Sequence, residues 1–170
     1  MLTLLVSAAE IEGVDFPDRV IMYEQPLVLN GVGVRTYFGF TIYAAALYQP
    51  IKTTDENQIL ALDSVSVLKM LYLVDIDQTD VRHAWLKSIG ESCNLPCVKY
   101  NKEIEKFLSQ ISQIKNKSAE TYIFTKNKLE IQTQTHQTII DDTDFSKLIL
   151  ATFIGKYPPT DTLKRGLLGQ

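Results

Sequence analysis

Apolar and polar side chains alternate along several short stretches of the chain, and the clearest stretch predicts a β-strand at residues 64–74. Successive side chains of a strand point to opposite faces of the sheet. Two apolar sets result, with Val65, Val67, Leu71 and Leu73 on one face and Leu68, Met70, Tyr72 and Val74 on the other. Because both faces are apolar, we predict that this strand is central in its sheet.

Earlier strands are predicted from the same pattern. Residues 11–20 contain Gly13 and Pro17, which favours an edge strand that ends in a Phe-Pro-Asp turn, and residues 21–29 follow as the next strand. Residues 36–48 carry no charge, so both faces of that strand are expected to be covered. Later strands are predicted at residues 121–125 and 129–133, which form a hairpin with its turn at Asn127. A further short strand is predicted at residues 138–140.

A single charged residue, Arg35, lies within the apolar residues 27–50. Asn30, Gly31 and Gly33 predict a turn there, so that Arg35 opens the second of two strands. A guanidinium cannot lose its proton inside a protein, so it must find anions or acceptors. Either Arg35 holds a buried polar network together, or it faces a cavity and meets an anionic ligand. On residue type alone the structural interpretation is favoured, because most buried charges are paired.

From residue 79 onward, apolar residues recur at intervals of three and four, which is typical of amphipathic helices. Two such helices, around residues 81–89 and 104–114, are predicted on either side of a break at residues 94–96. Shorter helices are predicted at residues 55–62, at residues 144–154 behind Asp142 or Thr143, and at residues 161–168 behind Thr160. This order of elements predicts an α+β fold, with an antiparallel sheet and helices on one face.

Composition narrows the classes of partner. A length of 170 residues with 45% hydrophobic residues suits one soluble globular domain with a sizeable core. The 17 basic and 20 acidic residues give a net charge of −3, and no Lys/Arg cluster is dense enough to follow a phosphate backbone, so no nucleic-acid partner is expected. Charges interrupt the apolar runs well short of the roughly 20 residues of a membrane span, so no integral span is expected.

The first nine residues, Met-Leu-Thr-Leu-Leu-Val-Ser-Ala-Ala, resemble the back half of a secretory signal without its basic start. We interpret residues 1–9 as the remnant of a signal peptide before a single domain at residues 10–170. An exported protein, for instance a periplasmic one, is then expected. If residues 1–9 are instead a first strand or a frayed terminus, a cytoplasmic location is expected.

Cys93 and Cys97 are the two cysteines of the chain. They form a disulfide loop in an oxidising compartment or remain buried thiols in the cytosol, and the residues leave both possibilities open. There is no second cysteine pair, and His83 and His136 show no ligand spacing, so no metal site is predicted. Residues 31–33 lack the third glycine of a dinucleotide site, and no nucleophile elbow is present, so no cofactor is expected.

Several short motifs, taken in sequence order, resemble the chalcone isomerase-like family. They are Gly13-Val-Asp-Phe-Pro17, Leu29-Asn-Gly-Val-Gly-Val-Arg35, Tyr43-Ala-Ala-Ala-Leu-Tyr48, and Phe153-Ile-Gly155 with Pro158-Pro159 and Leu167-Leu-Gly169. The resemblance covers residues 10–169. It is greatest to the short bacterial form of the family, because the connection between Arg35 and Tyr48 is shorter than in the plant pattern.

The resemblance implies an open-faced β-sandwich, in which a large antiparallel sheet carries a layer of helices and a ligand cleft lies between them. Plant enzymes of this family close a flavanone ring, whereas non-catalytic relatives hold fatty acids. In both, the arginine of the Gly-x-Gly-x-Arg motif faces the ligand, and Arg35 matches it. The cavity-facing interpretation of Arg35 then becomes the favoured one. The other catalytic positions match poorly, since Tyr43 stands where the enzymes have a threonine and Ser146 alone matches a later hydroxyl position.

Three hypotheses of function follow. The first is a binding module for a small amphipathic anion such as a fatty acid, with Arg35 anchoring the charged end and Tyr43 donating a hydroxyl, and with Phe40, Tyr72 and Ser146 completing the lining. The second is an isomerase or intramolecular lyase that acts on a phenolic or enone compound. There Arg35 stabilises charge and Tyr43 donates a proton. The third is a filled core with a structural Arg35 and a protein partner at the surface.

Overall fold

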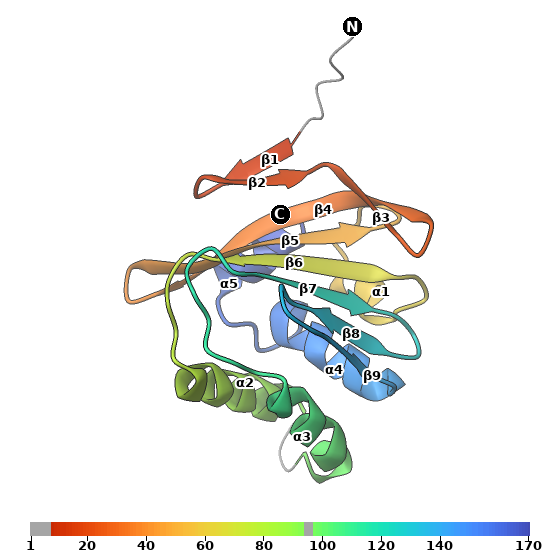
Figure 1. Ribbon diagram of the computed structural model, residues 1–170. Coiled ribbons are helices and arrows are strands. Elements are labelled where there is room, and N and C mark those ends of the chain that lie inside the picture. The colour runs from red at the N-terminus through yellow and green to blue at the C-terminus, as the bar shows by residue number, and fades with distance from the viewer. Residues whose placement is uncertain (1–7, 94–96) are drawn as a thin grey trace, which may run out of the picture.

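A computed structural model of the chain describes residues 8–93 and 97–170, which form a curved sheet with helices on one side (Figure 1). The main sheet has seven antiparallel strands in the order β3-β4-β5-β6-β7-β8-β9. They are β3 (Arg19–Met22), β4 (Gln25–Tyr37), β5 (Phe40–Gln49), β6 (Ser66–Tyr72), β7 (Ala119–Phe124), β8 (Leu129–Gln132) and β9 (Gln137–Ile140). β6 is the central strand, as predicted, and the predicted α+β architecture is confirmed.

All the helices pack on one side of this sheet, which we call the inner face (Figure 1). They are α1 (Glu56–Leu60), α2 (Gln78–Ser92), the 3₁₀ turn η1 (Val98–Tyr100), α3 (Asn101–Ser109), α4 (Thr143–Ile154) and α5 (Asp161–Leu167). Two predicted caps are present, since the Asp142 side chain accepts from the N–H of Phe145 and the Thr160 hydroxyl accepts from the N–H of Leu163. These caps set where α4 and α5 begin.

The opposite side of the sheet, the outer face, is partly covered by a separate hairpin of β1 (Ala8–Ile11) and β2 (Val14–Pro17). Val14 and Phe16 are buried there against Ala44 and Ala46 of β5. β5 is therefore buried on both faces, as its lack of charge predicts.

The prediction of one edge strand over residues 11–20 is wrong. Glu12 and Gly13 adopt the left-handed backbone conformation, with φ of 51° and 73°, and turn the chain back on itself between β1 and β2. A second turn of the same kind interrupts residues 21–29, because Tyr23 and Glu24 have φ of 51° and 62° between β3 and β4. Non-glycine residues rarely adopt this conformation, so this second turn has no strong sequence signal.

The predicted turn at Asn30, Gly31 and Gly33 is also wrong, because β4 continues through these residues, with a β-bulge at Asn30. The glycines instead let α5 lie against the strand. A Cβ atom on Gly33 would lie 2.7 Å from the carbonyl oxygen of Leu163. The amide of Asn30 donates to the carbonyl oxygen of Leu167 at 2.9 Å, which fastens the end of α5 to β4. The turn of this hairpin lies farther on, at residues 38–39.

A disulfide joins Cys93, at the end of α2, to Cys97. The predicted break at residues 94–96 lies outside the described residues, as does most of the predicted signal remnant, whose last two residues open β1. Across residues 8–93 and 97–170, no helix combines the length and the apolarity that a transmembrane helix requires.

Candidate functional site

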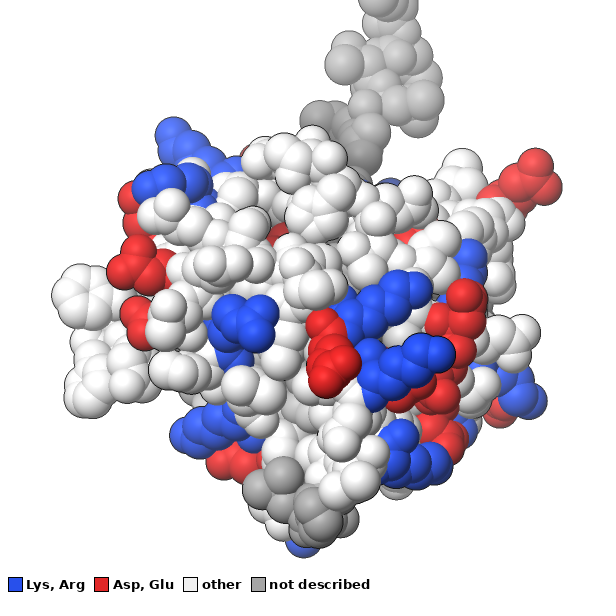
Figure 2. Space-filling model, turned by 60° about the horizontal axis from the view of Figure 1, so that its bottom comes forward, with Lys and Arg blue, Asp and Glu red and all other residues white. Residues whose placement is uncertain are grey.

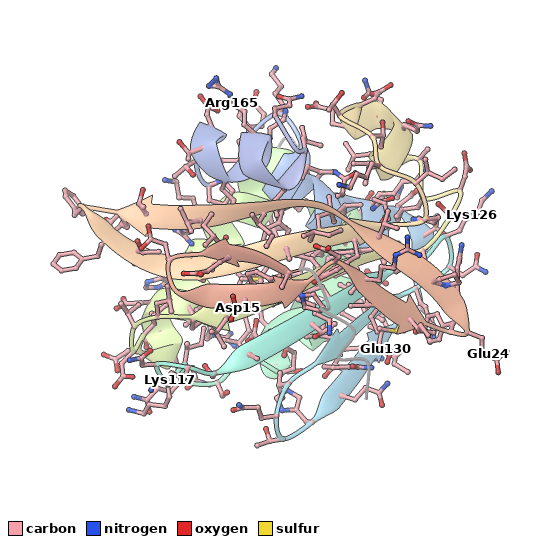
Figure 3. All side chains as sticks on the ribbon, turned by 90° about the horizontal axis from the view of Figure 1, so that it is seen from above. Asp15, Glu24, Lys117, Lys126, Glu130 and Arg165 are labelled. Carbon is pink, nitrogen blue, oxygen red and sulfur yellow. A yellow bond between two sulfur atoms is a disulfide. The ribbon has the colours of Figure 1, made fainter. Side chains whose placement is uncertain are left out.

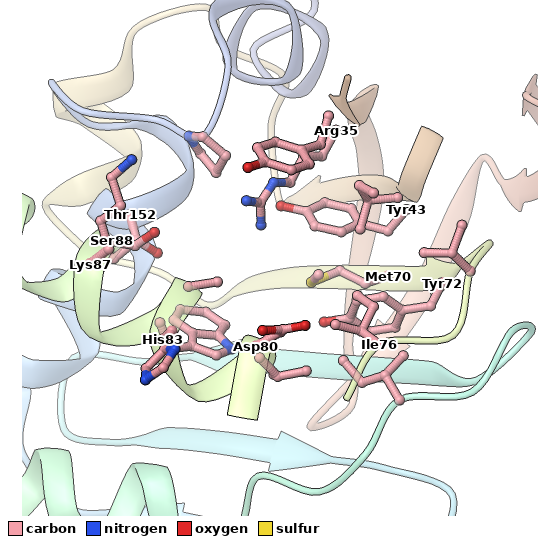
Figure 4. Close-up of a pocket in the computed structure, with 18 of the residues that line it drawn as sticks. Arg35, Tyr43, Met70, Tyr72, Ile76, Asp80, His83, Lys87, Ser88 and Thr152 are labelled. Atoms are coloured by element: carbon pink, nitrogen blue, oxygen red, sulfur yellow. The ribbon is translucent and has the colours of Figure 1, made fainter. Parts of the chain in front are cut away.

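A cleft of about 570 Å³ lies between the inner face of the sheet and the helices α2 and α4 (Figure 4). This volume is within the range of roughly 300–1,000 Å³ that is usual for small-molecule sites. β4, β5 and β6 form one wall, and α2, the end of α4 and Pro159 form the other. Apolar side chains contribute most of the lining surface, and they include Ile42, Met70, Val74, Ile76, Val81, Ala84, Trp85, Ile114 and Phe153.

Arg35 on β4 and Tyr43 on β5 are direct cross-strand partners. Such partners share a face of the sheet, so both side chains enter the cleft, and Figure 4 shows them directed toward the same part of it. Arg35 is half-buried. Within the described parts of the chain, no carboxylate lies within salt-bridge distance of its guanidinium. The charge of Arg35 is therefore directed into the cleft without an acidic partner from those residues.

Tyr72 on β6 continues this row, because it is the cross-strand partner of Tyr43. The two rings meet edge to face with their centroids 5.6 Å apart. Burial raises the pKa of both phenols, while the positive charge of Arg35 opposes the increase. Both hydroxyls therefore remain protonated at neutral pH and can donate hydrogen bonds.

Glu120 on β7 is the cross-strand partner of Met70, so it lies diagonally next to Tyr72 on the same face of the sheet. Its carboxylate accepts from the hydroxyl of Tyr122 at 2.7 Å and from that of Tyr72 at 3.3 Å. Burial raises the pKa of Glu120, and these two hydrogen bonds counteract part of the increase. Glu120 thus orients the hydroxyls of Tyr72 and Tyr122.

Polar residues of α2 and of the loop before it line another part of the cleft (Figure 4). Asp75 is already engaged, because it accepts from the N–H of Asn116 at 2.8 Å and pairs with Lys115 at 3.4 Å. These contacts, led by the backbone hydrogen bond, lower the pKa of Asp75. The remaining polar lining of this wall is Asp80, His83, Lys87, Ser88 and Thr152.

Three of the five predicted site residues, Arg35, Tyr43 and Tyr72, come together in the cleft. The other two lie elsewhere. Phe40 is 68% exposed at the end of the β4–β5 hairpin, which projects beyond the helices (Figure 1). Ser146 is fully buried in α4, where its hydroxyl donates to the carbonyl oxygen of Lys128 at 3.1 Å. Neither is a lining residue, so we do not include them in the site.

Sequence reasoning missed Glu120 and the whole contribution of α2. Alternation along β7 places Glu120 on the same face as Tyr122 and Phe124, and a carboxylate in that apolar row is a signal for a polar site. No comparable signal was present in α2, because Trp85 and Val81 fit an ordinary core stripe. Across residues 8–93 and 97–170, no three His, Cys, Asp or Glu side chains are grouped to hold a metal ion.

A large antiparallel sheet with helices and an apolar cleft on one face defines an α+β protein of the open-faced β-sandwich class. The chain belongs to the chalcone isomerase-like family, since the model of that family matches residues 8–169. No curated protein sequence matches it significantly. That the chain is a short bacterial form stays a prediction.

Among solved structures, the chain is similar to a fatty-acid binding protein of Arabidopsis thaliana. The TM-score is 0.77 with 15% sequence identity, and the match covers 95% of this chain and 96% of the plant protein. At this identity the likeness shows the shared fold.

Proposed function

We propose that this protein binds a fatty acid, or a small amphipathic anion of similar shape, with the acid group held by Arg35 and Tyr43. One observation carries the proposal. The guanidinium of Arg35 lies in an apolar cleft beside the buried phenol of Tyr43, and no carboxylate of the described residues pairs with it. The name of the Arabidopsis protein with the same fold supports the same class of ligand.

The chemistry of the two residues suits a carboxylate. A guanidinium presents several N–H donors in a plane and can donate two parallel hydrogen bonds to the oxygens of one carboxylate. Tyr43 can add a third hydrogen bond, because its raised pKa keeps the hydroxyl protonated. The same raised pKa makes Tyr43 a poor source of a proton, so we favour binding over an isomerase or lyase reaction that needs proton transfer from it.

The remaining cleft suits an acyl chain. Met70 and Ile76 on the sheet side and Trp85 and Phe153 on the helix side are apolar. Each methylene that leaves water for such a lining contributes about 0.8 kcal/mol. Affinity should therefore rise with chain length until the cleft is filled.

The first measurement is mass spectrometry of the purified protein under native conditions and then after denaturing extraction, to identify a co-purified acid. The second is a titration with a fluorescent fatty acid. Arg35→Ala should raise Kd about 10- to 100-fold, because hydrogen bonds to a charged group contribute about 1.5–3 kcal/mol.

A matched control is Lys69→Ala, which removes a positive charge from the other face of the same sheet, where Lys69 is paired with Ala46. It should leave Kd unchanged. Unaltered binding by folded Arg35→Ala, or an equal loss in both variants, would refute the role of Arg35.

A further inference from the structure

The β4–β5 hairpin ends in a cluster of exposed aromatic side chains, Tyr37, Phe38 and Phe40, which we call the aromatic tip. These residues are 60%, 83% and 68% exposed. The rings of Tyr37 and Phe38 meet edge to face, 4.5 Å apart. The hairpin extends past the rest of the sheet in Figure 1, and its outermost surface in Figure 2, at the left edge, carries no charged atoms.

Phe38 occupies a backbone conformation that does not suit it. Phe38 and Gly39 form the turn with φ of 47° and 79°, and Tyr37 pairs with Phe40 across it. Asparagine is the usual residue at the first position of such a turn, since a left-handed conformation costs a bulky residue on the order of 1–3 kcal/mol. A large aromatic at this position neither favours the turn nor fills the core.

Tyr23 has the same unfavourable backbone conformation as Phe38, but its side chain has a structural role. It also has a left-handed backbone, but its hydroxyl donates to the buried carboxylate of Glu130, and Lys128 lies 5.2 Å from its ring centroid. The ring of Tyr23 therefore stabilises the fold. Phe38, in contrast, is directed into solvent.

The size of the aromatic tip favours a lipid surface over a protein. Aromatic side chains present about 150–250 Å² each, so the three exposed rings offer roughly 400 Å², about half of what one partner buries in a stable protein interface. Aromatic rings on an uncharged loop are suited to the boundary between headgroups and acyl chains. Residues 25–54 contain no Asp or Glu, so the hairpin itself carries no carboxylate that such a boundary would exclude.

The aromatic tip also adjoins the cleft, because Tyr37 belongs to both. We propose that the aromatic tip inserts into the surface of a lipid bilayer and places the opening of the cleft against it. This proposal rests on the proposed function and extends it, because the amphipathic anion would enter the cleft from the lipid bilayer. Insertion itself requires no ligand in the cleft, so it is tested separately.

The experiment is co-flotation of the full chain with phosphatidylcholine vesicles in the absence of fatty acid. Phe38→Asn should lower the vesicle-bound partition coefficient about tenfold or more, because one fully exposed aromatic ring is removed from the lipid. Its thermal stability should stay the same or increase, since Asn accepts the left-handed turn. A thermal unfolding measurement on this variant then separates a loss of binding from a loss of folding.

Ile51→Asn is the matched control, because Ile51 is 79% exposed just beyond the other end of β5. It should bind vesicles like the unaltered protein. A second readout is Phe38→Trp, whose added fluorescence should shift to shorter wavelength when vesicles are present. Absence of vesicle binding by the unaltered protein, equal binding by Phe38→Asn, or a dimer in solution that Phe38→Asn dissociates would each overturn the proposal.

Discussion

Glu130 and Arg35 are charged residues on opposite faces of the same sheet, and their surroundings differ completely. Glu130 on β8 is 3% exposed. Its carboxylate accepts hydrogen bonds from Tyr23, Gln132 and Gln137, and Lys128 lies 3.5 Å away. Arg35 faces the cleft without an acidic partner among the described residues. Figure 3 looks onto the outer face, where Glu130 is labelled.

The contrast distinguishes a charge with a structural role from one that we propose is used by a ligand. Tyr23 is far from Glu130 in the chain. Its hydroxyl donates to Glu130, so the hydrogen bond joins the β3–β4 turn to β8 on the outer face of the sheet. Glu130 therefore connects two parts of the sheet that are far apart in the strand order. Among the residues that the structure describes, Arg35 pairs with no carboxylate, which supports our proposal that a ligand in the cleft uses its charge.

The largest expected effect is on folding stability. Glu130→Ala leaves the donors of Tyr23, Gln132 and Gln137 without their acceptor, and we expect a loss of about 2–4 kcal/mol in the free energy of unfolding. Arg35→Ala should lower the free energy of unfolding by less than about 1 kcal/mol, because Arg35 forms no ion pair with the residues that the structure describes. Denaturant titrations of both variants measure the difference. Equal losses would mean that the two charges are both structural.

A smaller effect should appear in the pH dependence of stability, because two carboxylates of the sheet are shifted in opposite directions. Burial by itself would raise the pKa of Glu130, but its hydrogen bonds outweigh burial and lower that pKa. Its stabilising contribution is therefore present above the unfolded pKa of about 4.3 and is lost as the pH falls through the lower folded pKa.

Glu120 has a raised pKa, so the folded state binds its proton more tightly than the unfolded state does. Stability from this group is present at low pH and falls as the pH rises from the unfolded pKa to the folded one. Glu120→Gln should therefore be as stable as the unaltered protein near pH 4 and more stable at pH 7. Thermal unfolding at both pH values measures this, and a variant that is less stable at pH 7 would contradict the assignment.

The smallest expected effect concerns Asp80, an exposed residue of the cleft lining. Removing its negative charge with Asp80→Asn should strengthen binding of a fatty acid about twofold at low salt, because exposed charges interact weakly. The gain should vanish in high salt. Weaker binding by this variant would indicate that the ligand carries a positive group near α2.

Much of the fold could be predicted from alternation and helical periodicity. The central position of β6, the hairpin of β7 and β8 and the two capped helices at the end of the chain follow from local patterns. The turn at Tyr23 and Glu24 could not be predicted, because its left-handed residues are not glycine or asparagine and distant contacts hold them. Gly31 and Gly33 looked like turn residues, although their role is to admit α5.

The sequence is informative about the candidate site where the arrangement depends on strand pairing, and uninformative where it depends on helix packing. Arg35 and Tyr43 are direct cross-strand partners, and their joint role in binding stays a prediction. The opposite wall depends on how α2 lies over the sheet, which no local pattern encodes. Phe40 shows the same limit, because its exposure depends on how far the hairpin projects beyond the helix layer.

The fastening of α5 to β4 has a consequence for the order of events during synthesis. Asn30 and Leu167 are 137 positions apart, and Gly33 lies against Leu163. A strand made early therefore remains unsupported on its inner face until the ribosome has released α5. Contacts of such long range also slow folding. Because Arg35 lies two residues beyond Gly33, the wall that carries it should become ordered only after α5 has been synthesised.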